Sequence, residues 1–107
     1  GPLIAKGMFD VALLLGQNTK IEVRQKEEKH LLNRYIAGLK NHGVDGLTFD
    51  LVWDDYRRCN LYNWVYAAVV AGTLDPSNEA GRAWMGQMVA RQSSVSEDLE
   101  VFNLLPS

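Results

Sequence analysis

The chain has 107 residues, of which 47% are hydrophobic and 22% charged, a balance that fits one folded domain and excludes disorder. Its formal net charge of −2 argues against a nucleic-acid surface, which needs concentrated Lys and Arg. No apolar segment is long enough to span a membrane, and the single cysteine, Cys59, excludes an internal disulfide. We therefore expect one domain over residues 1–107, located in the cytoplasm, with neither nucleic acid nor membrane as a partner.

The first predicted helix runs from Gly7 to Gly16. Apolar residues go most of the way round it, so we expect it to be largely buried. Asp10 lies in its first turn, where the positive end of the helix dipole favours a carboxylate, and a buried Asp10 would need partners. Before this helix, the apolar residues Leu3-Ile4-Ala5 are compatible with a short strand, which the sequence does not exclude.

The second predicted helix runs from Lys20 to His42, with Thr19 as its N-cap and Gly43 just past its end. The mixed-charge run 26–29 is typical of a solvated helix face. Spacings of three and four residues predict a buried face made of Val23, Leu31, Leu32, Tyr35, Ile36 and Leu39.

The third and fourth predicted helices are also amphipathic. Thr48 caps the third, which runs to Ala71 before Gly72; Asp75 and Pro76 start the fourth, which runs to Glu100. The buried face of the third is Phe49, Val52, Trp53, Tyr56, Leu61, Trp64, Val65, Ala68 and Val69. The buried face of the fourth is Ala80, Trp84, Met88, Val95, Leu99 and Phe102, interrupted by Gln92. Short connections favour antiparallel neighbours, so the prediction is an all-α fold of four main helices in an antiparallel, bundle-like arrangement.

A search for reactive groups finds no catalytic or metal-binding set. The histidines, His30 and His42, are too far apart in sequence to form a metal motif, and neighbouring carboxylates such as Asp54 and Asp55 point apart on a helix. Cys59 is expected to be a buried, inert thiol, because no histidine lies near it. The aromatic residues of the third helix cannot all face inward, so we expect some to be exposed.

Three stretches of the sequence form a further pattern: Gly7–Leu15, Glu28–Tyr35, and the run from Gly43-Val44 through Phe49, Trp53, Tyr56-Arg57 and Leu61. Together they resemble the C-terminal helical part of the aminoglycoside phosphotransferase and choline kinase superfamily, most closely its ecdysteroid-kinase-like branch. The likeness covers nearly the whole chain. Its most specific parts are Gly-x-x-Asp-Val-Ala at residues 7–12 and Asp-Tyr-Arg at residues 55–57. The resemblance implies the C-terminal helical subdomain of a protein-kinase-like fold.

Intact members of that superfamily use ATP and magnesium to transfer a phosphoryl group to a hydroxyl of a small molecule. The resemblance implies that their nucleotide-clamping Lys, His-Gly-Asp loop and Asp-Trp-Gln-like motif all precede Gly1. This chain would then hold no catalytic residue, metal or cofactor, and would be inactive alone, because phosphoryl transfer depends on those groups. The segment His42-Gly43-Val44-Asp45 is not the catalytic loop, because Val44 is inserted and no Asn follows at the required spacing.

The resemblance also implies roles for single residues. Trp53, Tyr56 and Arg57 lie where these enzymes build the pocket for the acceptor substrate. Asp10 matches an aspartate that supports the catalytic loop from a buried helix, although that loop is absent from these residues.

Three functions remain open: a fragment of a small-molecule phosphotransferase, a free-standing helical interaction or dimerisation module, and an enzyme with an unrecognised site. The expected partner is a second copy of the chain or an N-terminal kinase portion. Removing the rest of a kinase would uncover apolar surface, so we expect self-association through the first helix and part of the third.

Overall fold

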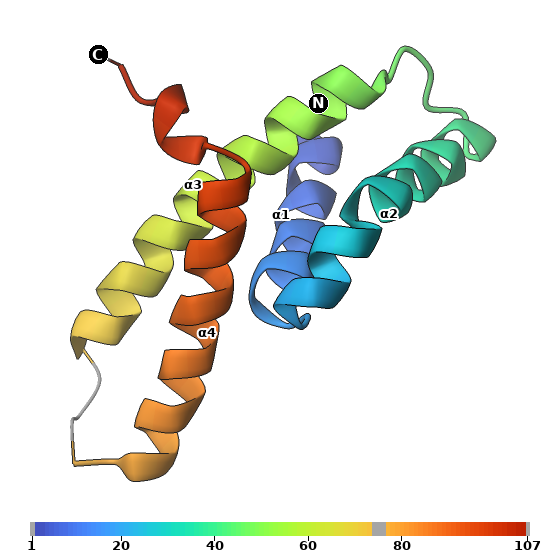
Figure 1. Cartoon of the computed structure of the whole chain (residues 1–107). Helices are drawn as coiled ribbons and strands as arrows, with labels where there is room; N and C mark the ends of the chain where they lie inside the picture. Colours follow the sequence, from blue (N-terminus) through green and yellow to red (C-terminus); the bar gives the residue numbers. More distant parts are fainter. Residues whose placement is uncertain (1, 74–76, 107) are drawn as a thin grey trace.

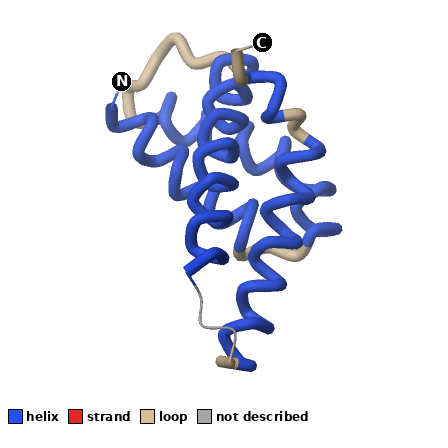
Figure 2. The backbone as a smooth tube through the Cα atoms, turned by 90° about the vertical axis from the view of Figure 1, so that its left-hand side faces the viewer, coloured by secondary structure: helices blue, strands red, loops and turns tan. Residues whose placement is uncertain are grey.

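The computed structural model describes residues 2–73 and 77–106, which contain helices and no strand (Figures 1 and 2). The elements are α1 (Pro2–Gln17), α2 (Ile21–Asn41), α3 (Phe49–Thr73), α4 (Glu79–Asp98) and the short 3-10 helix η1 (Val101–Leu104). The predicted all-α class with four main helices in a bundle-like arrangement is confirmed.

Helices α3 and α4 form the frame of the molecule. They run side by side in opposite directions, and each contacts all the other helices (Figure 1). Helix α1 packs across both of them, and α2 lies beside α1, contacts both α3 and α4, and ends near the start of α3 (Figure 1). One half of the α3–α4 pair is therefore covered by α1 and α2, and the other half stands alone.

Helix α1 begins at Pro2, five residues before the predicted Gly7, so the strand left open at Leu3-Ile4-Ala5 is wrong. The earlier start places Asp10 in the middle of the helix, where the dipole argument for its first turn does not hold. Asp10 is exposed, and so is Leu14, which shows that α1 is buried along one face and not all round.

The connection between α1 and α2 is held from the α1 side. The hydroxyl of Thr19 donates to Leu14 O at 2.7 Å, and Asn18 Nδ2 donates to Leu13 O at 3.1 Å. The predicted role of Thr19 as N-cap of α2 is wrong: Lys20 holds that position and gives no side-chain cap. Thr19 instead satisfies a carbonyl at the end of α1, where the last carbonyls have no intrahelical partner.

The connection between α2 and α3 follows the sequence prediction. Gly43 has φ +89°, a backbone conformation that favours glycine, and Val44 N donates back to Leu39 O at 3.0 Å. Thr48 accepts a hydrogen bond from Leu51 N at 3.2 Å, as an N-cap residue does.

The ends of α3 and α4 differ from the prediction. Helix α3 continues through Gly72 to Thr73, and the predicted start at Asp75-Pro76 lies outside the described residues. Asn78 caps α4 by accepting from Gly81 N at 2.8 Å. Helix α4 ends at Asp98, two residues early, because Glu100 adopts the left-handed conformation at φ 50° and turns the chain into η1.

The buried residues form two separate clusters. The main core joins α1, α2, α3, α4 and η1, and comprises Met8, Ala12, Leu15, Leu32, Val52, Tyr56, Cys59, Val95, Leu99 and Val101. The second cluster lies between α3 and α4 alone and comprises Ala67, Met85 and Met88.

Several predicted inner faces were wrong in the same way: apolar side chains are outside and polar ones inside. On α2 the buried residues are Arg24, Glu28 and Leu32, and Glu28 belongs to the run expected to be solvated. Asn60 and Asn63 are buried on α3, and Gln92 and Ser96 on α4. The residues predicted to be buried that are exposed are Val23, Leu31, Val65, Ala68, Val69, Ala80, Trp84 and Phe102.

Candidate functional site

A network of charged and polar side chains crosses the main core from α2 to α4. Its centre is Arg24, whose relative exposure is only 1%, next to Glu28 one turn along α2. The guanidinium Nη1 lies 3.4 Å from both carboxylate oxygens of Glu28. Burying an ion is costly, so a buried pair such as this one needs further partners on its remaining atoms.

Those partners come from helix α4. Arg24 Nη2 donates to Asp98 Oδ2 at 2.8 Å and to Ser94 Oγ at 3.1 Å, and Gln25 Nε2 donates to the same Asp98 oxygen at 2.9 Å. Partial burial on its own raises the pKa of Asp98. The hydrogen bonds from Gln25 and Arg24, together with the Arg24 charge, outweigh burial and lower that pKa below its ordinary value.

Helix α3 joins the network through Tyr56, which is fully buried. Its hydroxyl donates to Glu28 Oε2 at 2.8 Å. Burial raises the pKa of Tyr56 far above its ordinary value, and the adjacent Glu28 carboxylate raises it further. We call Arg24, Glu28, Tyr56, Ser94 and Asp98 the charged network. Its buried members form hydrogen bonds and ion pairs with one another. This geometry fits a role in positioning the helices better than a role in binding or converting a ligand.

The predicted pocket residues do not converge on one space. Trp53 contacts Tyr56 with ring centroids 5.6 Å apart, stacks on Phe49 at 5.4 Å, and carries Lys29 Nζ 5.6 Å from its ring centroid. Trp53 and Tyr56 are therefore in contact, on the side of α3 that meets α2.

Arg57 is held elsewhere, at the end of α4. Its Nε donates to Leu99 O at 2.7 Å and its Nη2 to Glu100 O at 3.0 Å. These carbonyls follow the last turn of α4, where a cation also interacts favourably with the helix dipole. Arg57 thus fixes the turn from α4 into η1.

Asp10 lies on the outside of α1, near Tyr35 of α2. Within the described part of the chain it makes no hydrogen bond or ion pair, and partial burial, followed by the Asp10 charge, raises the pKa of Tyr35. A Cβ on Gly7 would lie only 2.5 Å from the hydroxyl oxygen of Tyr35. The glycine therefore lets α1 and α2 approach closely. Among the described residues, the Asp10 carboxylate keeps its capacity to accept hydrogen bonds.

A second buried cluster of polar groups was not predicted. Gln92 Nε2 donates to Asn60 Oδ1 at 3.1 Å and to Ser96 Oγ at 3.3 Å, while its Oε1 accepts from Gln17 Nε2 at 3.0 Å. We call Gln17, Asn60, Gln92 and Ser96 the amide cluster. It connects α1, α3 and α4 where Gly16 of α1 lies close to Asn60 and Gln92. The signal in the sequence was Gln92, a polar residue at a position where the spacing predicts a core residue.

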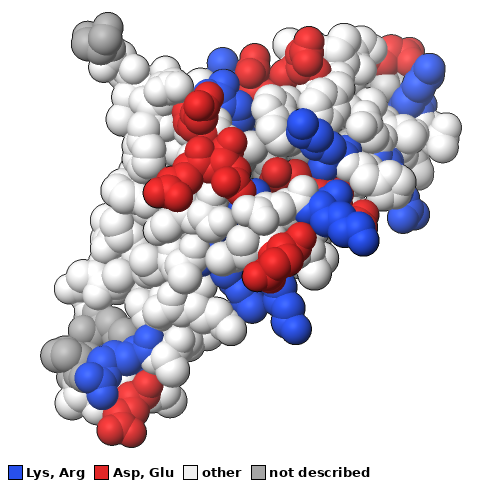
Figure 3. Space-filling model, in the orientation of Figure 1, with Lys and Arg blue, Asp and Glu red and all other residues white. Residues whose placement is uncertain are grey.

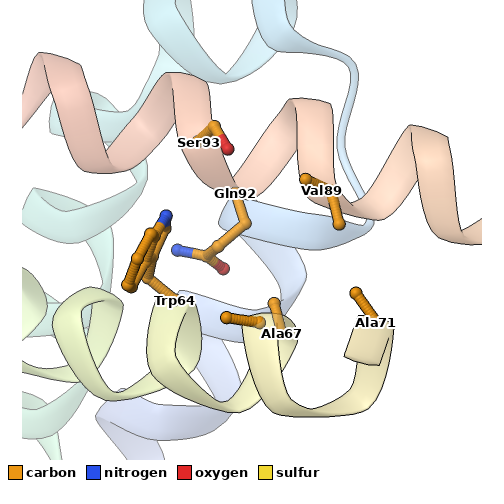
Figure 4. A pocket seen from close by; sticks show the side chains of 7 residues that line it. Trp64, Ala67, Ala71, Val89, Gln92 and Ser93 are labelled. Atoms are coloured by element: carbon orange, nitrogen blue, oxygen red, sulfur yellow. The ribbon is translucent and has the colours of Figure 1, made fainter. Parts of the chain in front are cut away.

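A small cavity opens between α3 and α4 next to the amide cluster (Figure 4). Its volume is about 130 Å³, and its lining residues are Trp64, Ala67, Ala68, Ala71, Val89, Gln92 and Ser93. A wider apolar groove of about 340 Å³ lies between α1 and α2, lined by Val11, Leu14, Leu15, Leu31, Arg34 and Tyr35. Neither is lined by Trp53, Tyr56 or Arg57.

A thiol and a metal-binding cluster are the two other kinds of reactive group that could support chemistry in the described residues. Cys59 is buried, as predicted, and burial followed by the nearby Asp55 charge raises its pKa to about 11, which keeps the thiol protonated. Over residues 2–73 and 77–106, no group of three or more His, Cys, Asp or Glu side chains is placed to hold a metal ion.

In the same ranges no helix combines the length and the apolar character needed to cross a bilayer.

Comparison of the chain with protein-family models, with curated proteins and with solved structures found no match.

Proposed function

We propose that the chain is the C-terminal helical portion of a small-molecule phosphotransferase, related to the aminoglycoside phosphotransferases and choline kinases and closest to the ecdysteroid-kinase-like branch. In this proposal the complete enzyme transfers the γ-phosphoryl group of ATP, with magnesium, to a hydroxyl of a small molecule. The 107 residues contain no His-Gly-Asp loop and no Asp-Trp-Gln motif, so they supply packing and not the phosphate-handling groups.

The observation that carries the proposal is that the residues behind the resemblance contact one another between helices. Gly7 meets Tyr35 across α1 and α2, and Glu28 accepts from Tyr56 across α2 and α3. Arg57, also part of the pattern, bonds Leu99 O at the end of α4, outside the pattern. Contacts of this kind are what a packing shared with that superfamily would give.

The exposed carboxylate of Asp10 also supports the proposal. Its hydrogen-bonding capacity is unused within the described residues, and backbone N–H groups of a loop docked on α1 would find an acceptor there. Trp53, half-buried and stacked on Phe49, could form the wall of an acceptor pocket whose other side comes from the kinase portion.

The first test is the coding DNA upstream of the codon for Gly1. An open reading frame encoding a His-Gly-Asp loop followed by an Asp-Trp-Gln motif is the expected result. A stop codon directly upstream, with no such motifs encoded nearby on another chain, would remove the proposal.

The second test uses protein. The 107-residue chain should show no ATP hydrolysis, and a protein that joins it to such a kinase portion should phosphorylate a small alcohol. In that protein Asp10→Ala should lower kcat. In the 107-residue chain the same change should leave the unfolding midpoint unchanged, because Asp10 is exposed there. Asp45→Ala, in the exposed α2–α3 turn, is the matched control and should leave kcat unchanged.

A second candidate function is a helical interaction module that acts through self-association. The observation in its favour is the row of exposed apolar side chains along α3, described next.

A further inference from the structure

The C-terminal half of α3 carries apolar residues on its outer side as well as its inner one. Tyr62, Val65, Tyr66 and Val69 have relative exposures between 48% and 63%. Their spacing of three, one and three residues places them on one helix face, and we call them the α3 stripe. Phe9 of α1 extends this surface, with its ring centroid 6.1 Å from that of Tyr62.

The α3 stripe itself carries no charge. No residue from 59 to 73 is charged, and the left flank of the molecule in Figure 3 is mostly white, with charged side chains at its lower end. The α2 side of the same view carries both signs of charge (Figure 3). An acidic or basic partner would find nothing to pair with on the stripe, whereas an identical uncharged face meets it without repulsion between like charges.

The order of side chains in the stripe is complementary to itself. If two copies of α3 lie antiparallel, with a two-fold axis between positions 65 and 66, Tyr62 faces Val69 of the other copy. By the same symmetry Val65 faces Tyr66. Each large ring then meets a small β-branched side chain, the alternation by which helices interdigitate at a crossing angle near +20°.

The charge at the end of the stripe fits the same arrangement. Arg58 lies one turn before Tyr62, and the two-fold axis places it opposite Thr73 of the other copy. Thr73 is the last residue of α3, where the negative end of the helix dipole attracts a cation. The Arg58 side chain is exposed, and its ion pair with Asp55 at 3.3 Å is also exposed, so it can exchange that partner at little cost.

From these observations we infer that the α3 stripe is a docking surface for a second copy of this chain, in an antiparallel two-fold dimer centred between Val65 and Tyr66. This inference does not rest on the proposed phosphotransferase origin, because it uses only the surface of α3. It makes α3 the centre of the self-association expected from the sequence, with Phe9 of α1 at the edge. The contact is one helix pair, so the dimer should be of micromolar stability.

The experiment is sedimentation velocity on the full 107-residue chain from low to high micromolar concentration. The expected result is a concentration-dependent monomer–dimer equilibrium. Tyr66→Glu should weaken the dimer roughly 30-fold or more, because it removes a buried ring and brings two carboxylates together at the axis. Circular dichroism should show that the variant stays helical, because Tyr66 does not contribute to either core cluster.

A charge-swap experiment tests the two-fold symmetry itself. The two copies of position 66 lie next to the axis, on opposite sides of it, so Tyr66→Glu and Tyr66→Lys should each be monomeric alone and should form a mixed dimer when combined. Arg58→Glu should weaken the dimer several-fold, because it reverses the charge facing the partner's helix end.

Two controls decide between this surface and others. Val23→Glu changes a side chain of similar exposure on α2 and should leave the dimer constant unchanged. Leu14→Glu introduces the same charge on the exposed side of α1. A wild-type chain that stays monomeric at every concentration would overturn the inference. So would a dimer that Leu14→Glu dissociates and Tyr66→Glu does not, or a mixture of the charge-swap variants that forms no mixed dimer.

Discussion

The two ends of the α3–α4 pair are stabilised in different ways. At the end covered by α1 and α2, the charged network and the amide cluster specify which atoms meet, within a core of ten buried residues. At the far end, Ala67 packs on Met85 and Met88 beside a cavity of about 130 Å³. Asn63 lies just before that end, and its buried Nδ2 has no hydrogen-bond partner among the described residues.

The comparison shows that the kind of side chain between two helices sets how tightly the pair is specified. Directional bonds fix the covered end, and removing one of their members leaves a buried polar group unsatisfied. Small and flexible side chains at the far end tolerate change, since methionine adapts its shape to its neighbours. Substitutions at the covered end should therefore cost more than those at the far end.

The largest expected effect is at Arg24. Arg24→Met leaves Glu28 buried and partly unpaired, and should lower the free energy of unfolding by about 3–5 kcal/mol in urea titrations. The control is Arg34→Met, because Arg34 is exposed on the same helix and should cost less than about 1 kcal/mol. Equal losses for the two variants would mean that the charged network does not specify the covered end.

A pair of glycines sharpens the comparison. A Cβ on Gly16 would lie 2.9 Å from Asn60 Oδ1 and 3.2 Å from Gln92 Oε1, so Gly16→Ala should cost about 1–3 kcal/mol by overpacking the amide cluster. Gly86, on the part of α4 toward the far end, has no atom within 4 Å of that position. Gly86→Ala should instead gain about 0.5–1 kcal/mol by restricting the unfolded chain. Opposite signs in thermal unfolding are the expected result; a loss at both positions would contradict this account of α4.

Filling the cavity should strengthen the far end. Ala71→Leu places three more carbon atoms beside Trp64 and Val89, and should stabilise the fold by about 0.5–2 kcal/mol. The control is Ala37→Leu on the exposed surface of α2, which should change the unfolding midpoint little. A destabilised Ala71→Leu would show that the cavity is too narrow to accept a side chain.

The smallest expected effect is the response of the charged network to acid. The folded-state pKa of Asp98 is lowered, so between this pKa and the higher pKa of the unfolded state, the unfolded chain binds more protons than the folded one. The stabilisation is fully present above the unfolded value of about 4 and is lost as the pH falls through the folded pKa. In Asp98→Asn, urea titrations from pH 7 to pH 3 should show a smaller loss than in the wild type; solvent screening of the exposed carboxylate keeps the difference small.

The sequence predicted the elements well and their orientation poorly. Periodicity and turn chemistry gave four helices, and Gly43 and Thr48 end and start helices as predicted, because caps depend on local contacts. The inner face of α2 was wrong because Arg24 is buried only through partners such as Asp98, which lies 74 residues away. The spacing of four residues between Arg24, Glu28 and Leu32 was the signal in the sequence for this buried face.

The candidate site was predictable only in part. Trp53 and Tyr56 are in contact, but Arg57 serves the end of α4, a role that depends on the left-handed turn at Glu100. The outer face of α3 could not be separated from its inner one, because residues 59–73 carry no charge to mark the solvent side. The buried Asn60 and Gln92 pair across 32 positions, beyond the reach of local patterns.

The single amide of Gln92 has a consequence for how α4 can move. Its hydrogen bonds reach Gln17 of α1 and Asn60 of α3 at once, so sliding α4 by one turn would break all of them together. Helix α4 therefore has one permitted register against the other helices over its second half. Among the described residues, no side-chain hydrogen bond joins its first half to another helix, so we expect that half to open before the second one.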